Sequence, residues 1–120
     1  MKKCVLIYDD DAEILNVCKA ILANSDYRVE TLLNCDNVIA DIELLKPDII
    51  LMDLWIPKIG GDKAISLMYE HESARNIPVI LFSANDEIEK ITQKTKANGY
   101  LRKPFDITDF KKVLNQYLGE

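Results

Sequence analysis

Cysteine and histidine are scarce in this chain of 120 residues. It has three cysteines, Cys4, Cys18 and Cys35, and one histidine, His71, with no C-x-x-C spacing among them. Zinc sites and disulfide frameworks both need closely spaced or paired ligands. We therefore expect three reduced thiols, as is usual in a reducing cytoplasm, in place of a metal or disulfide scaffold.

Long apolar runs and an excess of positive charge are also missing. No segment approaches the ~20 apolar residues that cross a bilayer, and the N-terminal apolar run is too short for a signal peptide. The net charge of −5 argues against nonspecific binding to nucleic acid or to an anionic membrane, since both need a basic face. The sequence thus predicts a cytoplasmic domain that contacts neither.

Short apolar runs that alternate with amphipathic segments fill the whole chain, without repeats or a linker. Residues 4–8, 48–53 and 77–83 are near-continuous apolar runs, typical of strands covered on both faces of a parallel sheet. Residues 27–32 and 99–103 are weaker strand candidates. The length suits one domain, which we place over residues 1–120.

Helical spacing of apolar residues separates these strands. Five helices are predicted, with Asp11 near the start of the first, Pro47 after the second and Asp106 as the N-cap of the fifth. Their apolar positions are Ile14, Val17, Cys18, Ile21 and Leu22; Val38, Ile39, Ile42 and Leu45; Ala64, Ile65 and Met68; Ile88 and Ile91; and Ile107, Phe110, Leu114, Tyr117 and Leu118. Five βα units in order predict an α/β fold, a doubly wound parallel sheet.

Functional residues of such a sheet lie at the carboxyl ends of its strands. Here the first strand runs into Asp9, Asp10 and Asp11, the third ends at Asp53, the fourth at Ser83 and the fifth at Lys103. Any one of these residues alone is most often a helix cap, a turn residue or a solvated charge. Their joint occurrence at four strand ends favours a site instead.

The chemistry of that set points to phosphoryl transfer. No glycine-rich loop follows the first strand, which counts against a dinucleotide or flavin site. The charges of Asp9, Asp10, Asp53 and Lys103 balance when one Mg²⁺ is added, and Mg²⁺ prefers oxygen ligands. A carboxylate beside a divalent cation and a lysine can attack a phosphoryl group and form an aspartyl phosphate.

Four stretches, in order and nearly in register, give the chain its family resemblance. They are VLIYDDDAEIL, PDIILMDLWIPKIGG, IPVILFSAN and GYLRKPF. The sequence resembles a receiver domain of two-component response regulators, similar to chemotaxis regulators, over essentially its whole length. The resemblance implies a flavodoxin-like fold of five parallel strands in the order 2-1-3-4-5 with five helices.

The resemblance also implies a role for each matching position. Asp53 would be the phosphoacceptor, and Asp9 and Asp10 would hold Mg²⁺, or Mn²⁺, together with Asp53 and the backbone carbonyl of Trp55. Lys103 would contact the phosphoryl group. The remaining implied residues are Ser83 and the backbone N–H of Ala84 as phosphoryl contacts, Ser83 and Tyr100 as switch residues, and a cis bond at Lys103–Pro104.

The implied partner is a histidine kinase or a histidine phosphotransfer protein that docks near the first helix. Phosphorylation would then change the face formed by the fourth helix, fifth strand and fifth helix, with no catalysis beyond the domain's own phosphorylation and dephosphorylation. The sequence names neither the kinase nor the output.

Some positions depart from the family pattern. Tyr8 stands where a small aliphatic residue is usual, so we expect different packing beneath the acidic pair. Trp55 is large for its position, and with Asn85 it flanks the path of an attacking water, where we expect it to shield an acyl phosphate. The stretch between Ser83 and Lys103 is slightly short, which predicts a trimmed fourth helix or exit loop.

Two alternatives stay open at this point. One is a haloacid-dehalogenase-like phosphohydrolase, in which Asp9 would be the nucleophile and Asp11 the acid/base; Glu13 departs from that family, and the chain is short for it. The other is a receiver-like binding module that is never phosphorylated, against which the complete set of site residues argues.

Overall fold

Five short strands form the centre of the molecule. The computed structural model describes residues 2–56 and 60–119. The strands are β1 (Cys4–Tyr8), β2 (Arg28–Leu32), β3 (Ile49–Asp53), β4 (Val79–Ser83) and β5 (Gly99–Arg102). They form one parallel sheet in the order β2-β1-β3-β4-β5, which confirms the predicted fold class. The predicted strand ends differ from the observed ones by at most two residues.

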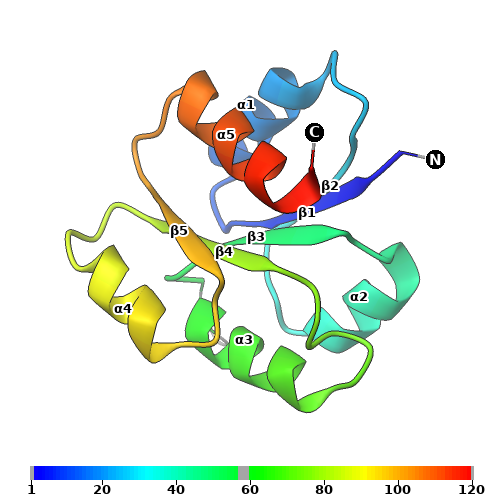
Figure 1. Ribbon diagram of the computed structural model, residues 1–120, viewed down its shortest axis with the longest axis vertical. Coiled ribbons are helices and arrows are strands. Elements are labelled where there is room, and N and C mark those ends of the chain that lie inside the picture. Colours follow the sequence, from blue (N-terminus) through cyan, green and yellow to red (C-terminus); the bar gives the residue numbers. More distant parts are fainter. Residues whose placement is uncertain (1, 57–59, 120) are drawn as a thin grey trace.

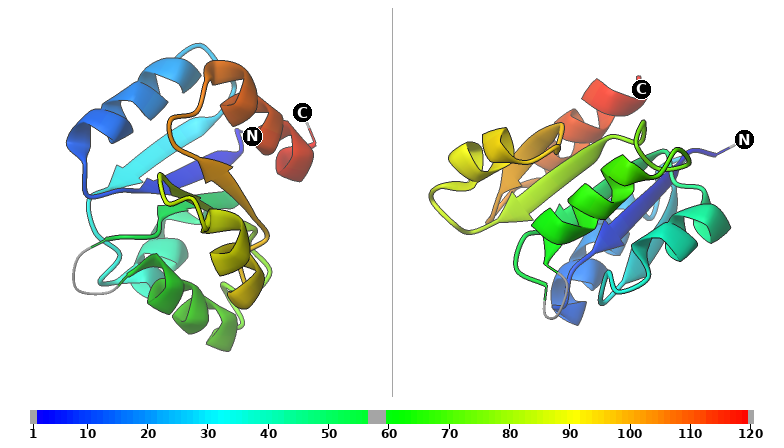
Figure 2. Two further views of the ribbon diagram at one scale, coloured as in Figure 1. Left: turned by 90° about the vertical axis from the view of Figure 1, so that its left-hand side faces the viewer. Right: turned by 90° about the horizontal axis from the view of Figure 1, so that it is seen from below.

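Helices cover both faces of this sheet. The helices are α1 (Ala12–Leu22), α2 (Val38–Leu45), α3 (Gly61–Glu70), α4 (Ile88–Lys94) and α5 (Ile107–Leu118). Figure 1 shows α1 and α5 above the sheet and α2, α3 and α4 below it, and the turned views of Figure 2 show the same two layers. The seven-residue α4 is the shortest of the five, in keeping with the short sequence between Ser83 and Lys103.

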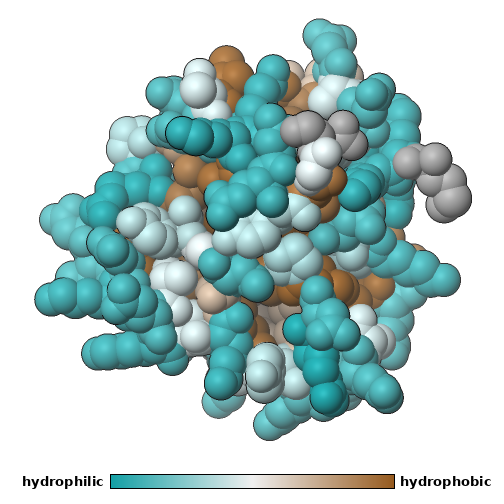
Figure 3. Space-filling view, viewed as in Figure 1, coloured by the Kyte–Doolittle hydropathy of each residue, from teal (hydrophilic) through white to brown (hydrophobic). Residues whose placement is uncertain are grey.

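Two apolar clusters, one on each face, hold the layers together. One joins Leu6, Tyr8 and Met52 of the sheet to α2, α3 and α4, and the other joins Ile7 and Phe82 to α1 and α5. Strands β1, β3 and β4 are buried along their full length because both faces are covered. The visible surface in Figure 3 is mostly hydrophilic, with hydrophobic residues showing only in gaps between polar ones.

Helix ends and helix faces follow most of the sequence predictions. Asp11 and Asp106 cap α1 and α5 with side-chain oxygens that accept the N–H groups of Glu13 and Asp109. Two of the apolar residues used to predict the helices lie off the buried face: Val17 is 51% exposed and Ile107 is 55% exposed.

The buried stripe of α1 explains the exposure of Val17. Leu15, Cys18 and Leu22 form its centre, which turns Val17 toward solvent. Ile107 is the first residue of α5, and it lies ahead of that helix's buried positions Phe110, Leu114 and Leu118.

The three cysteines are buried, and the helices are short. Cys4, Cys18 and Cys35 are buried, and burial raises the pKa of the Cys18 and Cys35 thiols to about 11. Among residues 2–56 and 60–119, none of the helices combines the length and the hydropathy needed to span a bilayer.

Gly61 sets how closely α3 approaches the end of β3. A Cβ atom built on Gly61 would lie 2.6 Å from the Asp53 carbonyl oxygen and 3.2 Å from the Leu54 Cα. Both of these are backbone atoms, which cannot move aside as a flexible side chain can. The absence of a side chain at Gly61 therefore helps to place the turn that carries Asp53.

Gly61→Ala should destabilise the fold by about 1–3 kcal/mol, as overpacking against fixed atoms does. Urea unfolding measures the difference. Gly60→Ala is the matched control, because its closest contact is the movable Asp62 carboxylate at 2.9 Å. Equal stability of the Gly61 and Gly60 variants would contradict this account of the turn.

Candidate functional site

The carboxyl ends of the strands bring the predicted polar residues together. Parallel strands all end at one edge, and β1 and β3 are neighbours, so Asp9 and Asp53 meet although they are 44 positions apart along the chain. Oxygen atoms of Asp9, Asp10 and Asp53 all lie within 4.8 Å of one another. Asp9 is fully buried and Asp53 is 7% exposed, whereas Asp10 is exposed. The cluster is therefore open to solvent on the side of Asp10.

Lys103 supplies the positive charge of this cluster. Its Nζ donates to Asp9 Oδ2 at 2.8 Å and lies 3.7 Å from Asp53 Oδ2. The same ammonium lies 4.7 Å from the centre of the Phe82 ring, where a cation is attracted to the ring face. Its backbone N–H donates to the Ser83 carbonyl, and the Lys103–Pro104 bond is cis, as the resemblance implied.

Asp53 has few partners of its own. Its Oδ1 accepts a long hydrogen bond, 3.4 Å, from the backbone N–H of Trp55. Burial raises the pKa of the Asp53 carboxyl, the Lys103 ammonium opposes that effect, and the charge of Asp9 adds to it. A carboxylate that is desolvated and loosely bound keeps its oxygens available for a cation or an electrophile.

The donor set fits a hard divalent cation. Three carboxylates and one ammonium leave a formal charge of −2, which one divalent cation cancels. Carboxylate oxygens are the ligands that Mg²⁺ prefers, and the exposed side of the cluster leaves room for the waters that Mg²⁺ retains. The acidic cluster is thus able to bind a metal, as the sequence predicted.

The other predicted residues lie at or just after the ends of β3 and β4, or on β5. Ser83 is buried at the end of β4, and its Oγ accepts the Asn85 N–H at 3.1 Å. Ala84 follows it and is exposed. Tyr100 lies on β5 beside a surface hollow against α5 and is 37% exposed. The Trp55 side chain, two residues after Asp53, is 65% exposed.

Asp11 does not join the acidic cluster. Its Oδ1 accepts the Glu13 N–H at 2.9 Å, and its own N–H donates to Asp9 Oδ1 at 2.9 Å. It therefore caps α1 and steadies Asp9. The phosphohydrolase alternative needs Asp11 as an acid/base, and this geometry gives it a structural task instead.

Tyr8 has a partner that the sequence did not indicate. Its side chain points into the cluster under α2, away from the acidic edge, and its hydroxyl donates to Asp41 Oδ2 at 2.8 Å. Burial and the Asp41 carboxylate raise the pKa of this phenol, so it stays a donor. The phenol thus anchors α2 to the last residue of β1, directly before Asp9.

Asp53→Asn should raise the free energy of unfolding at pH 7 when no divalent cation is present. Because folding raises the pKa of this carboxyl, keeping it ionised in the native state lowers the free energy of unfolding at pH values above the raised pKa. This loss disappears as the pH falls to about 3.8, the pKa of the unfolded carboxyl, because the unfolded state then binds the proton as well. The advantage of the variant should therefore fade as the pH falls toward that value. Urea unfolding across this pH range measures it.

Two further observations complete the test of the Asp53 carboxylate. Asp26→Asn, an exposed control, should change stability by less than about 0.5 kcal/mol. Adding Mg²⁺ should stabilise the wild type more than Asp53→Asn, because a ligand that binds only the native state stabilises it. A lower stability of Asp53→Asn at pH 7 without metal would contradict the raised pKa.

Comparison with known sequences gives one family over most of the chain. The sequence profile described as "Response regulator receiver domain" matches residues 5–115. The transcriptional regulatory protein KdpE of Staphylococcus aureus is 34% identical over 113 residues, covering 92% of this chain and 48% of that protein. The chain spans about half the length, or less, of the first curated relatives it matches. The polar-differentiation response regulator DivK of Brucella anthropi is 26% identical and is matched over 99% of its length.

Solved structures share the fold at low sequence identity. The chemotaxis protein CheY4 of Vibrio cholerae superposes with a TM-score of 0.88 at 23% identity, over 98% of this chain and 99% of that one. The receiver domain of a sensor histidine kinase from Pseudomonas aeruginosa gives 0.86 at 24% identity over 100% of both chains, and its structure holds a magnesium ion in the active-site cleft.

These matches agree with the sheet order 2-1-3-4-5 and with the acidic cluster beside Lys103. The chain belongs to the response regulator receiver domain family, phosphoacceptor modules of two-component signalling rather than enzymes with a separate substrate.

Proposed function

We propose that Asp53 is the phosphoacceptor and that a histidine kinase or a histidine phosphotransfer protein is the donor. The observation that carries the proposal is the position of the Asp53 carboxylate, inside a three-carboxylate cluster and 3.7 Å from the Lys103 ammonium. Asp9 is already paired with Lys103 at 2.8 Å and is fully buried. Asp53 is therefore the better placed of these two buried carboxylates to attack.

The transfer step follows from this geometry. An Asp53 oxygen attacks the phosphorus of the donor phosphohistidine in line, the P–N bond breaks, and its electron pair leaves with the imidazole nitrogen. Lys103 would stabilise the phosphoryl oxygens by charge, and the backbone N–H of Ala84 would donate to them. The donor docks near α1, where Val17 offers an exposed apolar side chain.

Mg²⁺ is the proposed cofactor, with Mn²⁺ as a substitute. Asp9, Asp10 and Asp53 would hold it, with the backbone carbonyl of Trp55 as a further ligand. When bound, the cation neutralises charge on the transferring group. The magnesium in the active-site cleft of the Pseudomonas relative supports this choice.

The acyl phosphate would bias a two-state switch. Phosphorylation exchanges a carboxylate for a dianion, so new donors to the phosphoryl oxygens become favourable. Ser83 lies at the end of β4 beside this charge, and its hydroxyl is the proposed donor. Tyr100 on β5 would then change its exposure and carry the change to the face of α4, β5 and α5.

Asp53 should gain one phosphoryl group when the protein is incubated with acetyl phosphate and Mg²⁺. Intact-protein mass spectrometry measures the added mass. Asp53→Ala should gain none, and chelation of the divalent cation should slow the reaction in the wild type. Asp11→Asn serves as the control that keeps the cluster intact. A phosphoryl group found on Asp53→Ala, or turnover of a generic phosphate ester, would overturn the assignment.

Trp55→Ala should shorten the lifetime of the aspartyl phosphate severalfold, because the bulky indole shields it from the attacking water. The decay of phosphorylated protein, followed by mass after removal of the phosphodonor, measures the lifetime. Leu33→Ala is the matched control, since Leu33 is also an exposed apolar side chain, 52%, just after a strand. An unchanged lifetime in Trp55→Ala would refute shielding.

A further inference from the structure

A groove between α3 and α4 lies on the opposite side of α4 from β5 and α5. Its larger hollow has a volume of about 530 Å³. A smaller hollow continues it toward the start of β4, and Lys96 lines both. We call this the α3–α4 groove. Its lining includes Asp62, Lys63, Ile65, Met68, Tyr69, Arg75, Ile91, Lys94 and Lys96.

Positive charge is concentrated along this groove. Lys63, Arg75, Lys94 and Lys96 line it, against the single carboxylate of Asp62. The whole chain carries a net charge of −5, so this stretch has the opposite sign to the rest of the molecule. A ligand with carboxylates is therefore attracted here and repelled elsewhere.

The bottom and the rim of the groove are partly apolar. Ile65 and Met68 of α3 are core residues that reach its lining, and Ile91 of α4 is half-buried there. Tyr69 at the rim is 51% exposed, and the Lys96 ammonium sits 4.8 Å from the centre of its ring. This contact holds one cation and one aromatic ring together at the rim, a combination suited to protein recognition.

The hollow between β5 and α5 offers a weaker case for the same kind of ligand. Its volume is about 290 Å³, and Arg102 and Lys112 there face Asp109. Arg102 also donates to the backbone carbonyl of Asp86, which partly occupies its guanidinium. The α3–α4 groove is both larger and more uniformly positive.

We propose that the α3–α4 groove docks a segment of a partner protein that presents carboxylates beside apolar side chains. The charge of the groove selects the carboxylates, and Ile91 and Tyr69 receive the apolar groups. A nucleic acid fits less well, since its continuous negative charge would also face the acidic remainder of the chain. The inference goes beyond the proposed phosphotransfer and stands whether or not Asp53 accepts a phosphoryl group.

A designed peptide tests the proposal directly. The probe is a fluorescein-labelled amphipathic helix of about 16 residues, roughly four turns, with leucines along one face and glutamates flanking them. Fluorescence anisotropy with the unphosphorylated full chain measures its affinity. Binding should weaken at least about tenfold when the salt concentration rises from about 0.05 to 0.5 M, because screening removes the attraction. A peptide with lysine in place of glutamate should not bind.

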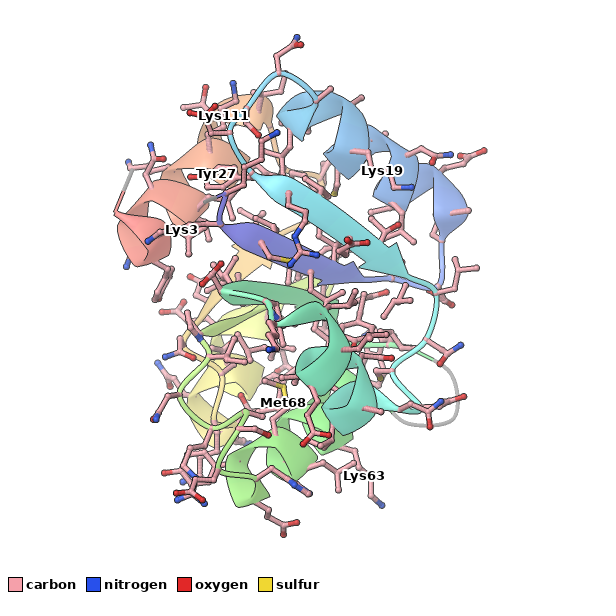
Figure 4. All side chains as sticks on the ribbon, turned by 90° about the vertical axis from the view of Figure 1, so that its right-hand side faces the viewer. Lys3, Lys19, Tyr27, Lys63, Met68 and Lys111 are labelled. Carbon is pink, nitrogen blue, oxygen red and sulfur yellow. The ribbon has the colours of Figure 1, made fainter. Side chains whose placement is uncertain are left out.

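Paired charge reversals locate the binding site. The double variant Lys63→Glu, Lys94→Glu should weaken probe binding about tenfold or more. The control Lys19→Glu, Lys111→Glu changes the net charge equally and should stay within about twofold of the wild type. Figure 4 shows why the control is informative: Lys63 lies on α3, whereas Lys19 and Lys111 lie on α1 and α5 at the other end of the molecule. Circular dichroism checks that both variants fold.

Several outcomes would overturn the proposal. Equal weakening by both double variants would mean long-range attraction without docking in the groove. If the probe does not bind at concentrations up to about 1 mM, its affinity is too weak for a docking site. Amide shifts that fall outside α3 and α4 in nuclear magnetic resonance titrations would place the site elsewhere. Binding of duplex DNA in the groove, or self-association of the chain through it, would identify a different occupant.

Discussion

The ion pair between Lys103 and Asp9 is the contact on which the site depends. It joins residues 94 positions apart that directly follow β5 and β1, two strands that β3 and β4 separate in the sheet. Burying Asp9 and Asp53 side by side would be costly without a cation between them. Lys103 supplies that cation permanently, so the sheet edge can fold in the absence of metal. The two negative charges that remain make the cluster able to bind a metal ion.

The loop between β4 and α4 is tied to this edge by polar contacts. The Ser83 hydroxyl accepts the Asn85 N–H, and the Arg102 guanidinium donates to the Asp86 carbonyl. The helix that follows has only seven residues, and the side chain of its N-cap residue, Glu87, makes no capping hydrogen bond. The loop that follows Ser83 thus leads directly into the shortest helix of the five.

Sequence reasoning reached the fold and the site because both rest on short-range signals. Apolar runs predicted the buried strands, and polar residues at their ends predicted the cluster of Asp9, Asp53 and Lys103. Other features depend on tertiary position and could not be found this way. The Tyr8–Asp41 bond crosses from β1 to α2, and neither residue shows in sequence which side it faces.

Which face of a helix is buried, and where surface charges gather, also depend on tertiary position and could not be predicted from the sequence. Val17 fits the period of α1 but lies just off the stripe that reaches the sheet. The cations of the α3–α4 groove are dispersed between positions 63 and 96, and only the packing of α3 beside α4 brings them to one surface.

The exposed indole of Trp55 has a practical consequence for anyone who works with this protein. It is the only tryptophan of the chain, and its backbone N–H bonds the Asp53 carboxylate. Its emission in the unlabelled protein therefore comes from the edge of the acidic cluster and from nowhere else. A cation in the cluster, or the covalent change proposed at Asp53, would alter the charge next to the fluorophore. The molecule thus carries its own optical reporter.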